Sequence, residues 1–269
     1  VIEATAAGGT HRYQKIVKFK NLRELGKAVS PHSYRILKKE CLDLPDKVYS
    51  KRFVELSDEQ KKAYAEMKAN AMSILKGESM TAVNVLTQLI RLHQITCGHM
   101  KTDSRQIIDL KNNRLTELMQ ILDETSGKAI IWANYIHDIE AIEKIINKEF
   151  GNDSCCTYYG ATATEDRQKC INKFQDPDSK LRFFIGNTQT GGYGITLTEA
   201  STVIYYSNNY DLEKRIQSED RAHRIGQKNK VLYIDLVAKG TVDDKIIQSL
   251  RNKVNIAKEI SGEELITWI

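Results

Sequence analysis

Five short runs of β-branched and aromatic residues, separated by longer stretches, most constrain how this chain can fold. Each run has the length and composition of a buried strand. Between the first three runs, apolar residues recur at the three- and four-residue spacing of amphipathic helices. This order predicts an α/β fold, a parallel sheet flanked by helices on both faces. The runs are AIIWA (129–133), CCTYY (155–159), RFFIG (182–186), VIYYS (203–207) and VLYIDLV (231–237).

Helices are predicted between the strands and at both ends of this region. Ser57 and Gln60 fit a capping box at the start of an early helix. A second early helix follows, and the middle region carries no strand signal, so we expect it to be α-helical. Thr241 and Asp244 are suited to cap the last helix. The predicted helical stretches are 57–75, 83–95, 136–149, 164–174, part of 211–224 and the segment after Thr241.

Composition and charge place the chain among ordinary globular proteins. It has 41% hydrophobic and 28% charged residues. No apolar run is long enough for a membrane span, so we expect no membrane partner. The first residue is Val1 rather than Met, which favours a fragment of a longer protein. Residues 1–52 hold 12 Lys and Arg against 5 Asp and Glu, which fits either contact with a polyanion or a solvated basic face.

The chain has five cysteines, an odd number. Cys155 and Cys156 are adjacent in a predicted strand and should point to opposite faces, as suits reduced, partly buried thiols. We therefore expect a reducing, intracellular compartment. His93, Cys97 and His99 lie close in sequence, but no CxxC pair completes a zinc site. Ordinary residues at a helix end are the favoured interpretation, and no metal site is predicted.

Two polar segments are expected at the carboxyl ends of the strands, where ligands collect in open parallel sheets. The first is GNTQTGGYGITLTEA (186–200). Its glycines allow a close approach to a backbone, and its threonine hydroxyls can donate to phosphate. A tight turn that needs glycine explains the same residues without a ligand. Both interpretations stay open on composition alone.

The second segment is QSEDRAHRIGQ (217–227). Arg221 and Arg224 would share one face of a helix, so both guanidinium groups can reach one anionic centre. Pairing with Asp220 or Glu219 in a structural ion cluster is the alternative. His223 has no orienting carboxylate in a known geometry, so an acid–base function for it is the weaker hypothesis.

The sequence contains candidate groups for binding phosphate but no phosphate-binding loop. A P-loop needs G-x-x-x-x-G-K-[ST], and the fragments beginning at Gly26 and Gly127 lack both the upstream glycine and the hydroxyl residue. An acidic Mg²⁺ site after an apolar strand is also absent from the sequence. We therefore expect the chain not to hydrolyse ATP by itself.

TQTGGYGITLTEA followed by QSEDRAHRIGQ closely resembles motifs five and six of the Swi/Snf-type ATPases, the double-stranded DNA translocases of helicase superfamily two. KAIIWANYIHDIEAI resembles the fourth motif of that family. YYGATATEDRQKCINKF and LVAKGTVDDKI resemble its strand–glycine–helix segment and its closing strand and helix. The motifs agree in order, and the resemblance covers roughly residues 31–258.

The resemblance implies a second RecA-like lobe preceded by a mainly α-helical protrusion, with the first lobe missing. Residues 1–56 would form the junction from that lobe, 57–113 the protrusion and 114–269 the RecA-like lobe. In this family ATP with Mg²⁺ lies between the lobes, so the first lobe of the same parent chain would be a partner. Double-stranded DNA, bound through its phosphates, would be the other.

Site residues follow from the resemblance, position by position. Arg221 and Arg224 would be arginine fingers that stabilise charge on the γ-phosphate. Gln217 and Asp220 would orient them, and the glycines at 192 and 194 would let the loop approach the nucleotide. The nucleotide-side residues are thus Arg221, Arg224, Gln217, Asp220, Gly192 and Gly194. DNA phosphates would contact Asn134, Gly160, Thr162, Arg167, Thr188 and Gln189.

Departures from the family pattern affect two of these regions. Leu212 stands where the family has proline before motif six, and Gln189 stands where motif five commonly has arginine. The LPDK and CGHM segments, with short protrusions, are more similar to compact phage, bacterial or annealing-helicase-like members than to large chromatin remodellers. We therefore expect a cytoplasmic, bacterial or phage-encoded protein rather than a nuclear one. A non-catalytic DNA-binding or regulatory module and the lobe of a strand-separating helicase are the alternative functions.

Overall fold

The computed structural model divides the chain into two compact units, which we describe separately. One is built mainly from residues 56–112 and also includes the first 35 residues, and the other contains 36–55 and 113–253. The proposed boundaries at 56 and 113 stay predictions. The structure describes residues 2–5, 12–15, 20–34, 41–76, 82–102, 104, 106–191 and 194–261.

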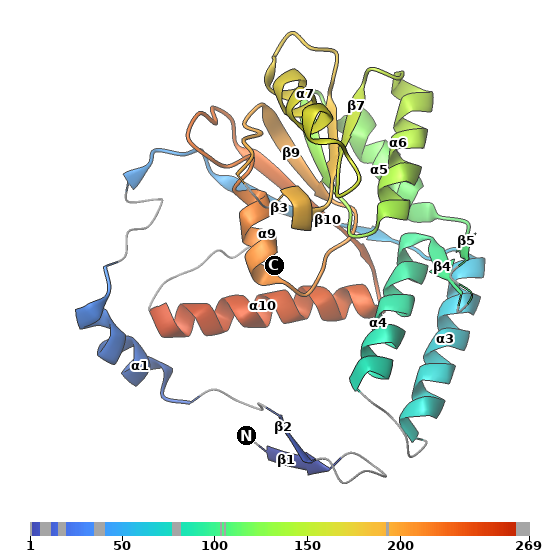
Figure 1. The fold of residues 1–269 in the computed structure, drawn as a ribbon, viewed down its shortest axis with the longest axis vertical. Coiled ribbons are helices and arrows are strands. Elements are labelled where there is room, and N and C mark those ends of the chain that lie inside the picture. The colour runs from blue at the N-terminus through green and yellow to red at the C-terminus, as the bar shows by residue number, and fades with distance from the viewer. Residues whose placement is uncertain are drawn as a thin grey trace. The chain divides into compact units, whose positions relative to one another are not determined.

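A six-stranded, wholly parallel sheet forms the centre of the larger unit (Figure 1), which confirms the predicted α/β architecture. All five predicted strands are present, with small shifts at their ends. The strand order is β3-β10-β9-β6-β8-β7, a crossover pattern in which neighbours in space are distant in sequence. The strands are β3 (Lys47–Val54), β6 (Lys128–Trp132), β7 (Cys155–Tyr158), β8 (Phe183–Gly186), β9 (Ala200–Tyr205) and β10 (Val231–Ala238).

Strand β3 is the sixth strand, which the sequence did not predict. Among the described strands it pairs with β10 alone, with Lys47 opposite Val231. Most of its side chains are exposed or half-buried, and Lys51 and Arg52 lie in its middle. Charged side chains suit the edge of a sheet, but they remove the apolar run that marks a central strand. For that reason composition alone does not reveal it.

Helices cover both faces of this sheet. The predicted helices α6 and α7 are confirmed, whereas α5 was not predicted. Helix α6 buries Ile139, Ile142 and Ile146, which lie outside the core cluster that α7 joins through Cys170 and Phe174. The two helices therefore pack on opposite faces. The helices of this unit are α5 (Asn113–Glu124), α6 (Ile136–Phe150), α7 (Thr164–Gln175), α8 (Thr188–Gly191), α9 (Leu212–Glu219) and the start of α10 (Val242–Ser261).

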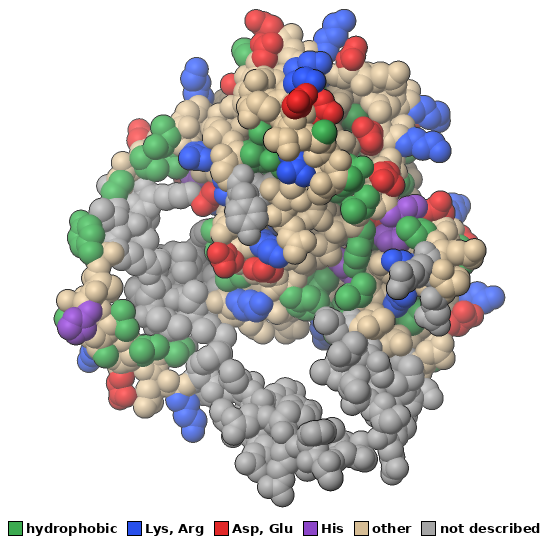
Figure 2. Space-filling model, in the orientation of Figure 1, with side chains coloured by type: hydrophobic (Ala, Val, Ile, Leu, Met, Phe, Trp, Pro, Cys, Tyr) green, Lys and Arg blue, Asp and Glu red, His purple; other side chains and the backbone are tan. Residues whose placement is uncertain are grey.

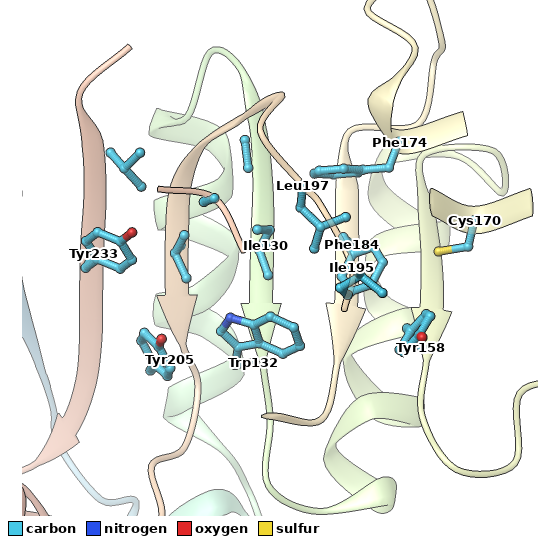
Figure 3. Close-up of a cluster of buried hydrophobic side chains, with 14 of the residues drawn as sticks. Ile130, Trp132, Tyr158, Cys170, Phe174, Phe184, Ile195, Leu197, Tyr205 and Tyr233 are labelled. Carbon is cyan, nitrogen blue, oxygen red and sulfur yellow. The ribbon is translucent and has the colours of Figure 1, made fainter. Parts of the chain in front are cut away.

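A cluster of buried aromatic and aliphatic side chains fills the face of the sheet that α7 covers (Figure 3). Trp132 is fully buried on β6, opposite Tyr205 of β9 in the strand register. Its ring meets Phe184 of β8 edge-on, with 6.0 Å between the ring centroids. Aromatic rings on three adjacent strands thus fix the spacing of the sheet just before the strands end.

A disulfide joins β7 to α7, contrary to the expected reduced thiols. Cys156 and Cys170 are bonded, with 5.9 Å between their Cα atoms. Cys155 is a free, buried thiol, and burial raises its pKa to about 12. Cys155 is thus a thiol and Cys156 is in a disulfide, which is consistent with the predicted orientation of the two side chains to opposite faces of the strand. The expectation of a free thiol was wrong at Cys156, because its partner lies 14 residues further along the chain.

The second unit contains a helical pair and a small hairpin. The capping box at the start of α3 is confirmed: the Ser57 backbone N–H donates to Gln60 Oε1, and the Gln60 N–H donates to Ser57 Oγ. The expectation of a region without strands was wrong, because β4 and β5 pair antiparallel. Its elements are α3 (Asp58–Lys76), α4 (Ala82–Cys97), β4 (His99–Lys101) and β5 (Ile107–Asp109).

The remaining described elements precede residue 33. They are a strand pair, one helix and a 3-10 turn, namely β1 (Ile2–Thr5), β2 (Arg12–Lys15), α1 (Leu22–Val29) and η1 (Ser30–His32). Within the described ranges, no helix is long and apolar enough to cross a membrane.

Candidate nucleic-acid and phosphate site

Polar loops follow four neighbouring strands at one edge of the main sheet. In the parallel register Gly186, the last residue of β8, lies opposite both Trp132 and Tyr158, the last residues of β6 and β7. Trp132 in turn lies opposite Tyr205, the last residue of β9. The segments after these strands therefore start at one level, the carboxyl edge. The sequence-predicted DNA residues Asn134, Gly160, Thr162, Thr188 and Gln189 are all on these segments.

Side-chain hydrogen bonds join the loops after β6, β8 and β9. The Asn134 N–H donates to Ser207 Oγ at 2.8 Å, and the Asn134 carbonyl accepts from Asn187 Nδ2 at 2.9 Å. Thr188 is buried, and its Oγ1 accepts from Asn209 Nδ2 at 3.4 Å. Asn134 and Thr188 therefore also bind neighbouring loops, which gives them a structural function beside the predicted contact with DNA.

The loop after β7 is held by Arg167 at the start of α7. One amino group of its guanidinium donates to the carbonyls of Tyr159 and Gly160, at 3.0 and 2.9 Å. The same guanidinium lies over the ring of Tyr158, 5.6 Å from its centroid. Thr162 Oγ1 accepts from the Tyr159 N–H at 3.2 Å. Gly160 and Thr162 thus lie in one small turn whose shape Arg167 stabilises.

Of the two glycines expected to face the nucleotide, the structure describes Gly194. Gly192 lies outside the described residues. Gly194 is exposed, has a φ of 69° and has no atom within 4 Å of the position a Cβ would take. Its backbone is therefore open, in a conformation that favours glycine. A cavity of about 440 Å³ beside it is lined also by Thr164 and Arg167 of α7.

The segment with Arg221 and Arg224, residues 219–227, is called the arginine-bearing turn. It does not lie at the carboxyl edge, so the expectation that this segment follows the carboxyl ends of the strands was wrong. Helix α9 starts after the end of β9 and runs back along the sheet, which carries residues 219–227 to the amino ends of the strands. Gln227 Nε2 donates to the carbonyl of Ala200, the first residue of β9. His223 Nε2 is hydrogen-bonded at 2.7 Å to the carbonyl of Pro45, two residues before β3.

Arg221 and Arg224 differ in exposure. Arg221 is half-buried, and its Nε donates to the Gln217 carbonyl at 3.0 Å. One of its amino groups donates to the Ile195 carbonyl at 3.3 Å. Arg224 is exposed. Burial, and after it the positive charge of Arg224, lower the pKa of Arg221. Two guanidinium groups that repel each other form a centre that an anion would stabilise.

The two residues expected to orient these arginines do so in part. Gln217 supplies its backbone carbonyl to Arg221, while its side-chain amide donates to Glu213 Oε1. Asp220 ends α9, and its carboxylate lies 3.6 Å from Lys47 Nζ. The orienting contact seen from Gln217 is thus made by the main chain.

A buried ion network beneath the arginine-bearing turn was not predicted. Arg215 is 2% exposed, and its guanidinium donates to both carboxylate oxygens of Asp235 and to Glu219 Oε1. It also donates to Asn208 Oδ1 and lies over the ring of Tyr205, 3.3 Å from the centroid. Burial opposes its charge, but the carboxylates outweigh burial and hold its pKa above the ordinary value.

The second carboxylate of this network is paired from the opposite side. Glu219 is fully buried, and its Oε2 accepts from Lys47 Nζ and from the Tyr49 hydroxyl, both at 2.9 Å. Burial, followed by the charge of Glu219, raises the pKa of Tyr49. No signal local to residues 215–219 reveals this network, because charged residues on a short helix are usually solvated. The charge of Asp235 inside an otherwise apolar strand is the one available hint.

Charged side chains on the visible face do not separate by sign. Figure 2 shows Lys and Arg interspersed with Asp and Glu over the described surface. Within the described residues no group of three or more His, Cys, Asp or Glu is placed to hold a metal ion. The arrangement therefore offers guanidinium, hydroxyl and backbone groups for anions.

A model of the helicase conserved C-terminal domain matches residues 110–226 of this chain. Protein CHROMATIN REMODELING 4 of Arabidopsis thaliana is 27% identical over 261 residues, covering 90% of this chain and 12% of that protein. The uncharacterized ATP-dependent helicase MG018 of Mycoplasma genitalium is 26% identical, covering 95% and 26%. The Sulfolobus solfataricus SWI2/SNF2 ATPase core in complex with double-stranded DNA is 28% identical with a TM-score of 0.63, covering 88% of this chain and 51% of that one.

These comparisons correct the expected location. Several relatives are eukaryotic chromatin-remodelling proteins of Arabidopsis and of two yeasts, and one is named a nuclear protein. The preference for a cytoplasmic, bacterial or phage-encoded protein was therefore wrong, although bacterial relatives also match. Similarity over most of the chain outweighs the short segments on which that preference rested. The chain spans between 12% and 28% of the length of these curated relatives.

Proposed function

Because the chain belongs to the Swi2/Snf2-type helicases and carries their C-terminal lobe, we propose that it is the second lobe of an ATP-driven translocase on double-stranded DNA. The observation that best supports this function is the pair of guanidinium groups on one rigid turn. A phosphate placed between Arg221 and Arg224 would relieve their repulsion, which is the property that an arginine finger needs.

ATP with Mg²⁺ would be bound mainly by a first lobe that supplies the P-loop and the acidic residues. When bound, the nucleotide supplies the γ-phosphoryl group that water attacks. This chain would contribute the exposed Arg224 as the group that approaches the phosphate. Arg221, whose guanidinium is partly engaged by two backbone carbonyls, would hold a fixed position beside it. The open backbone at Gly194 would border the nucleotide.

The carboxyl edge would contact DNA phosphates, a function distinct from that of the arginine-bearing turn. Hydroxyl and backbone groups of the loops after β6, β7 and β8 can donate to phosphate oxygens without reading bases. Arg167 would add a positive charge to this edge. The structure of a relative with double-stranded DNA supports this class of ligand. Binding through phosphates makes affinity fall as salt rises.

The direct test is ATP turnover by the full-length protein with and without duplex DNA. We expect Arg224→Ala to lower the DNA-stimulated turnover number by about a hundredfold or more, by analogy with the loss of other arginine fingers. Lys148→Ala, a change of an exposed cation on α6, is the matched control and should leave turnover unchanged. An unchanged turnover number in Arg224→Ala would exclude an arginine finger at this position.

Two further assays separate the alternative functions. A strand-displacement assay with a forked duplex should show little product, because we propose translocation along an intact duplex. Efficient unwinding would favour a strand-separating helicase instead. This chain alone should bind duplex DNA weakly but show no ATP hydrolysis, since its sequence contains no P-loop. Hydrolysis by the isolated chain would contradict the proposed division of the active site.

A further inference from the structure

We propose that Lys47 and Tyr49 of β3 are positioning residues that hold the arginine-bearing turn in its working geometry. The inference rests on the proposed function, because it assigns a purpose to the same two arginines. Both residues contact the segment just before Arg221. They would act through Glu219 and Asp220, which immediately precede Arg221 in the chain.

Four contacts bind the segment 45–49 to the turn. The Pro45 carbonyl is hydrogen-bonded to His223 Nε2 at 2.7 Å, and the Tyr49 hydroxyl donates to Glu219 Oε2 at 2.9 Å. Lys47 Nζ lies 2.9 Å from Glu219 Oε2 and 3.6 Å from Asp220 Oδ1. These contacts link residues 170 or more positions apart in sequence. The start of β3 and the residues just before it therefore hold the arginine-bearing turn in place.

Glu219 is the point through which β3 acts on the arginines. Its carboxylate is held by Arg215 on one side and by Lys47 and Tyr49 on the other. Its backbone carbonyl accepts from the N–H groups of Ala222 and His223, at 3.2 and 3.1 Å. That carbonyl also accepts from the Tyr233 hydroxyl at 2.9 Å. A shift of Glu219 would thus move the backbone between the two arginines.

Lys47 also balances charge next to Arg221. Burial and the charge of Arg224 lower the pKa of Arg221, and the carboxylate of Asp220 partly opposes this because it attracts that guanidinium. Lys47 Nζ lies 3.6 Å from the same carboxylate and competes for it. Removal of the lysine would leave Glu219 and Asp220 with less compensation. Arg221 would then be drawn towards Asp220 and away from a phosphate.

The ion pair between Lys47 and Glu219 is largely buried. The side chains of Lys47 and Glu219 are 14% and 0% exposed. By contrast, Arg52 on the same strand pairs with Glu117 and Glu124, and its side chain is 35% exposed. Two cations on one strand therefore both pair with glutamate, one in a buried contact and the other in a more exposed one, which gives a matched control.

The first experiment measures DNA-stimulated ATP turnover of the full-length protein. We expect Lys47→Met to lower kcat at least about tenfold, equivalent to roughly 1.4 kcal/mol, with KM for ATP changed less than about twofold. Lys47→Arg should recover most of the turnover, and Arg52→Met should match the unchanged protein. A normal kcat in Lys47→Met would overturn the inference, as would an equal loss in Arg52→Met.

Comparison with Arg224→Ala separates this inference from the proposed function. Loss of turnover in Arg224→Ala but not in Lys47→Met contradicts the positioning by β3 alone. Normal turnover in both variants contradicts the arginine fingers themselves. The two results therefore distinguish failure of the positioning by β3 from failure of the arginine fingers.

A second variant keeps the inference testable if Lys47→Met fails to fold. Tyr49→Phe removes the hydroxyl that donates to Glu219 but retains the ring, which stacks on Tyr233 with 5.1 Å between centroids. Amide hydrogen exchange at Ala222 and His223, whose N–H groups donate to Glu219, should then become faster than in Arg52→Met. Unchanged exchange together with unchanged kcat would contradict the inference.

Discussion

The loop after β7 at the carboxyl edge and the arginine-bearing turn are held in place in opposite ways. The loop after β7 is closed by neighbours in sequence: Arg167 donates to Tyr159 and Gly160, which lie seven or eight residues away. The turn at 219–224 is instead fixed by buried charges and by a strand some 170 residues distant. The loop after β7 is thus stabilised locally, whereas the arginine-bearing turn depends on contacts across the sheet. The loops after β6, β8 and β9 are intermediate, because they are hydrogen-bonded to one another.

This difference fits the two proposed ligands. A loop closed by local hydrogen bonds, as the loop after β7 is, can adjust without disturbing the sheet, which suits contact with a DNA backbone whose position varies along the duplex. A turn anchored by buried ions moves only when the sheet moves. Such rigidity suits a group that must meet a phosphate in one geometry.

The largest expected loss of stability comes from disrupting the buried ion network beneath the arginine-bearing turn. Asp235→Ala leaves the Arg215 guanidinium buried without its main carboxylate, and we expect unfolding free energy to fall by about 3–5 kcal/mol. Urea unfolding of this chain measures the loss. Asp211→Ala is the control on the same helix, since Asp211 caps the exposed start of α9 and should cost only about 1 kcal/mol. Similar losses in the two variants would contradict a special anchor beneath the arginines.

The next effect concerns the attachment of α7, which carries Arg167. Cys156→Ser removes the disulfide that joins β7 to α7, and we expect a loss of about 3 kcal/mol for a closed loop of this length. Thermal unfolding without reductant, compared with the exposed-site control Cys41→Ser, measures it. Reductant should lower the Tm of the unchanged protein but not that of Cys156→Ser. Equal sensitivity to reductant in both would contradict the bond.

The smallest effect concerns DNA binding at the carboxyl edge. Arg167→Ala should weaken binding of this chain uniformly across duplex sequences and reduce the slope of log affinity against log salt by about 1. Fluorescence anisotropy at several salt concentrations gives both quantities. Lys148→Ala on α6 removes an exposed charge elsewhere and should leave the slope unchanged. A sequence-dependent loss would indicate base contacts rather than phosphate contacts.

Local sequence patterns predicted the first region better than the second. Five strands and helices α6 and α7 follow from apolar runs and helical spacing, because burial of these residues is decided within each element. The loops that carry Asn134, Gly160 and Thr188 follow in turn from the strand ends. Their shared edge is a consequence of parallel pairing, so sequence order was sufficient to place them.

The arginine-bearing turn could not be placed in this way. Its position depends on how far α9 runs back along the sheet, and its anchors are long-range. Lys47 and Glu219 are 172 residues apart, so neither predicts the other. Strand β3 could not be predicted for the same reason, because its charged side chains indicate an edge strand only once its pairing with β10 is known. The disulfide likewise could not be predicted without knowing that α7 packs on β7.

The separation of the two regions is tested most directly by measuring both functions in one variant of the full-length protein. For Arg224→Ala, we expect DNA-saturated ATP turnover to fall by about a hundredfold, whereas the Kd for duplex DNA changes less than about threefold. That result would place the arginine in phosphate chemistry and DNA binding at the opposite edge. A loss of DNA affinity comparable to the loss of turnover, or no loss of turnover at all, would contradict this account.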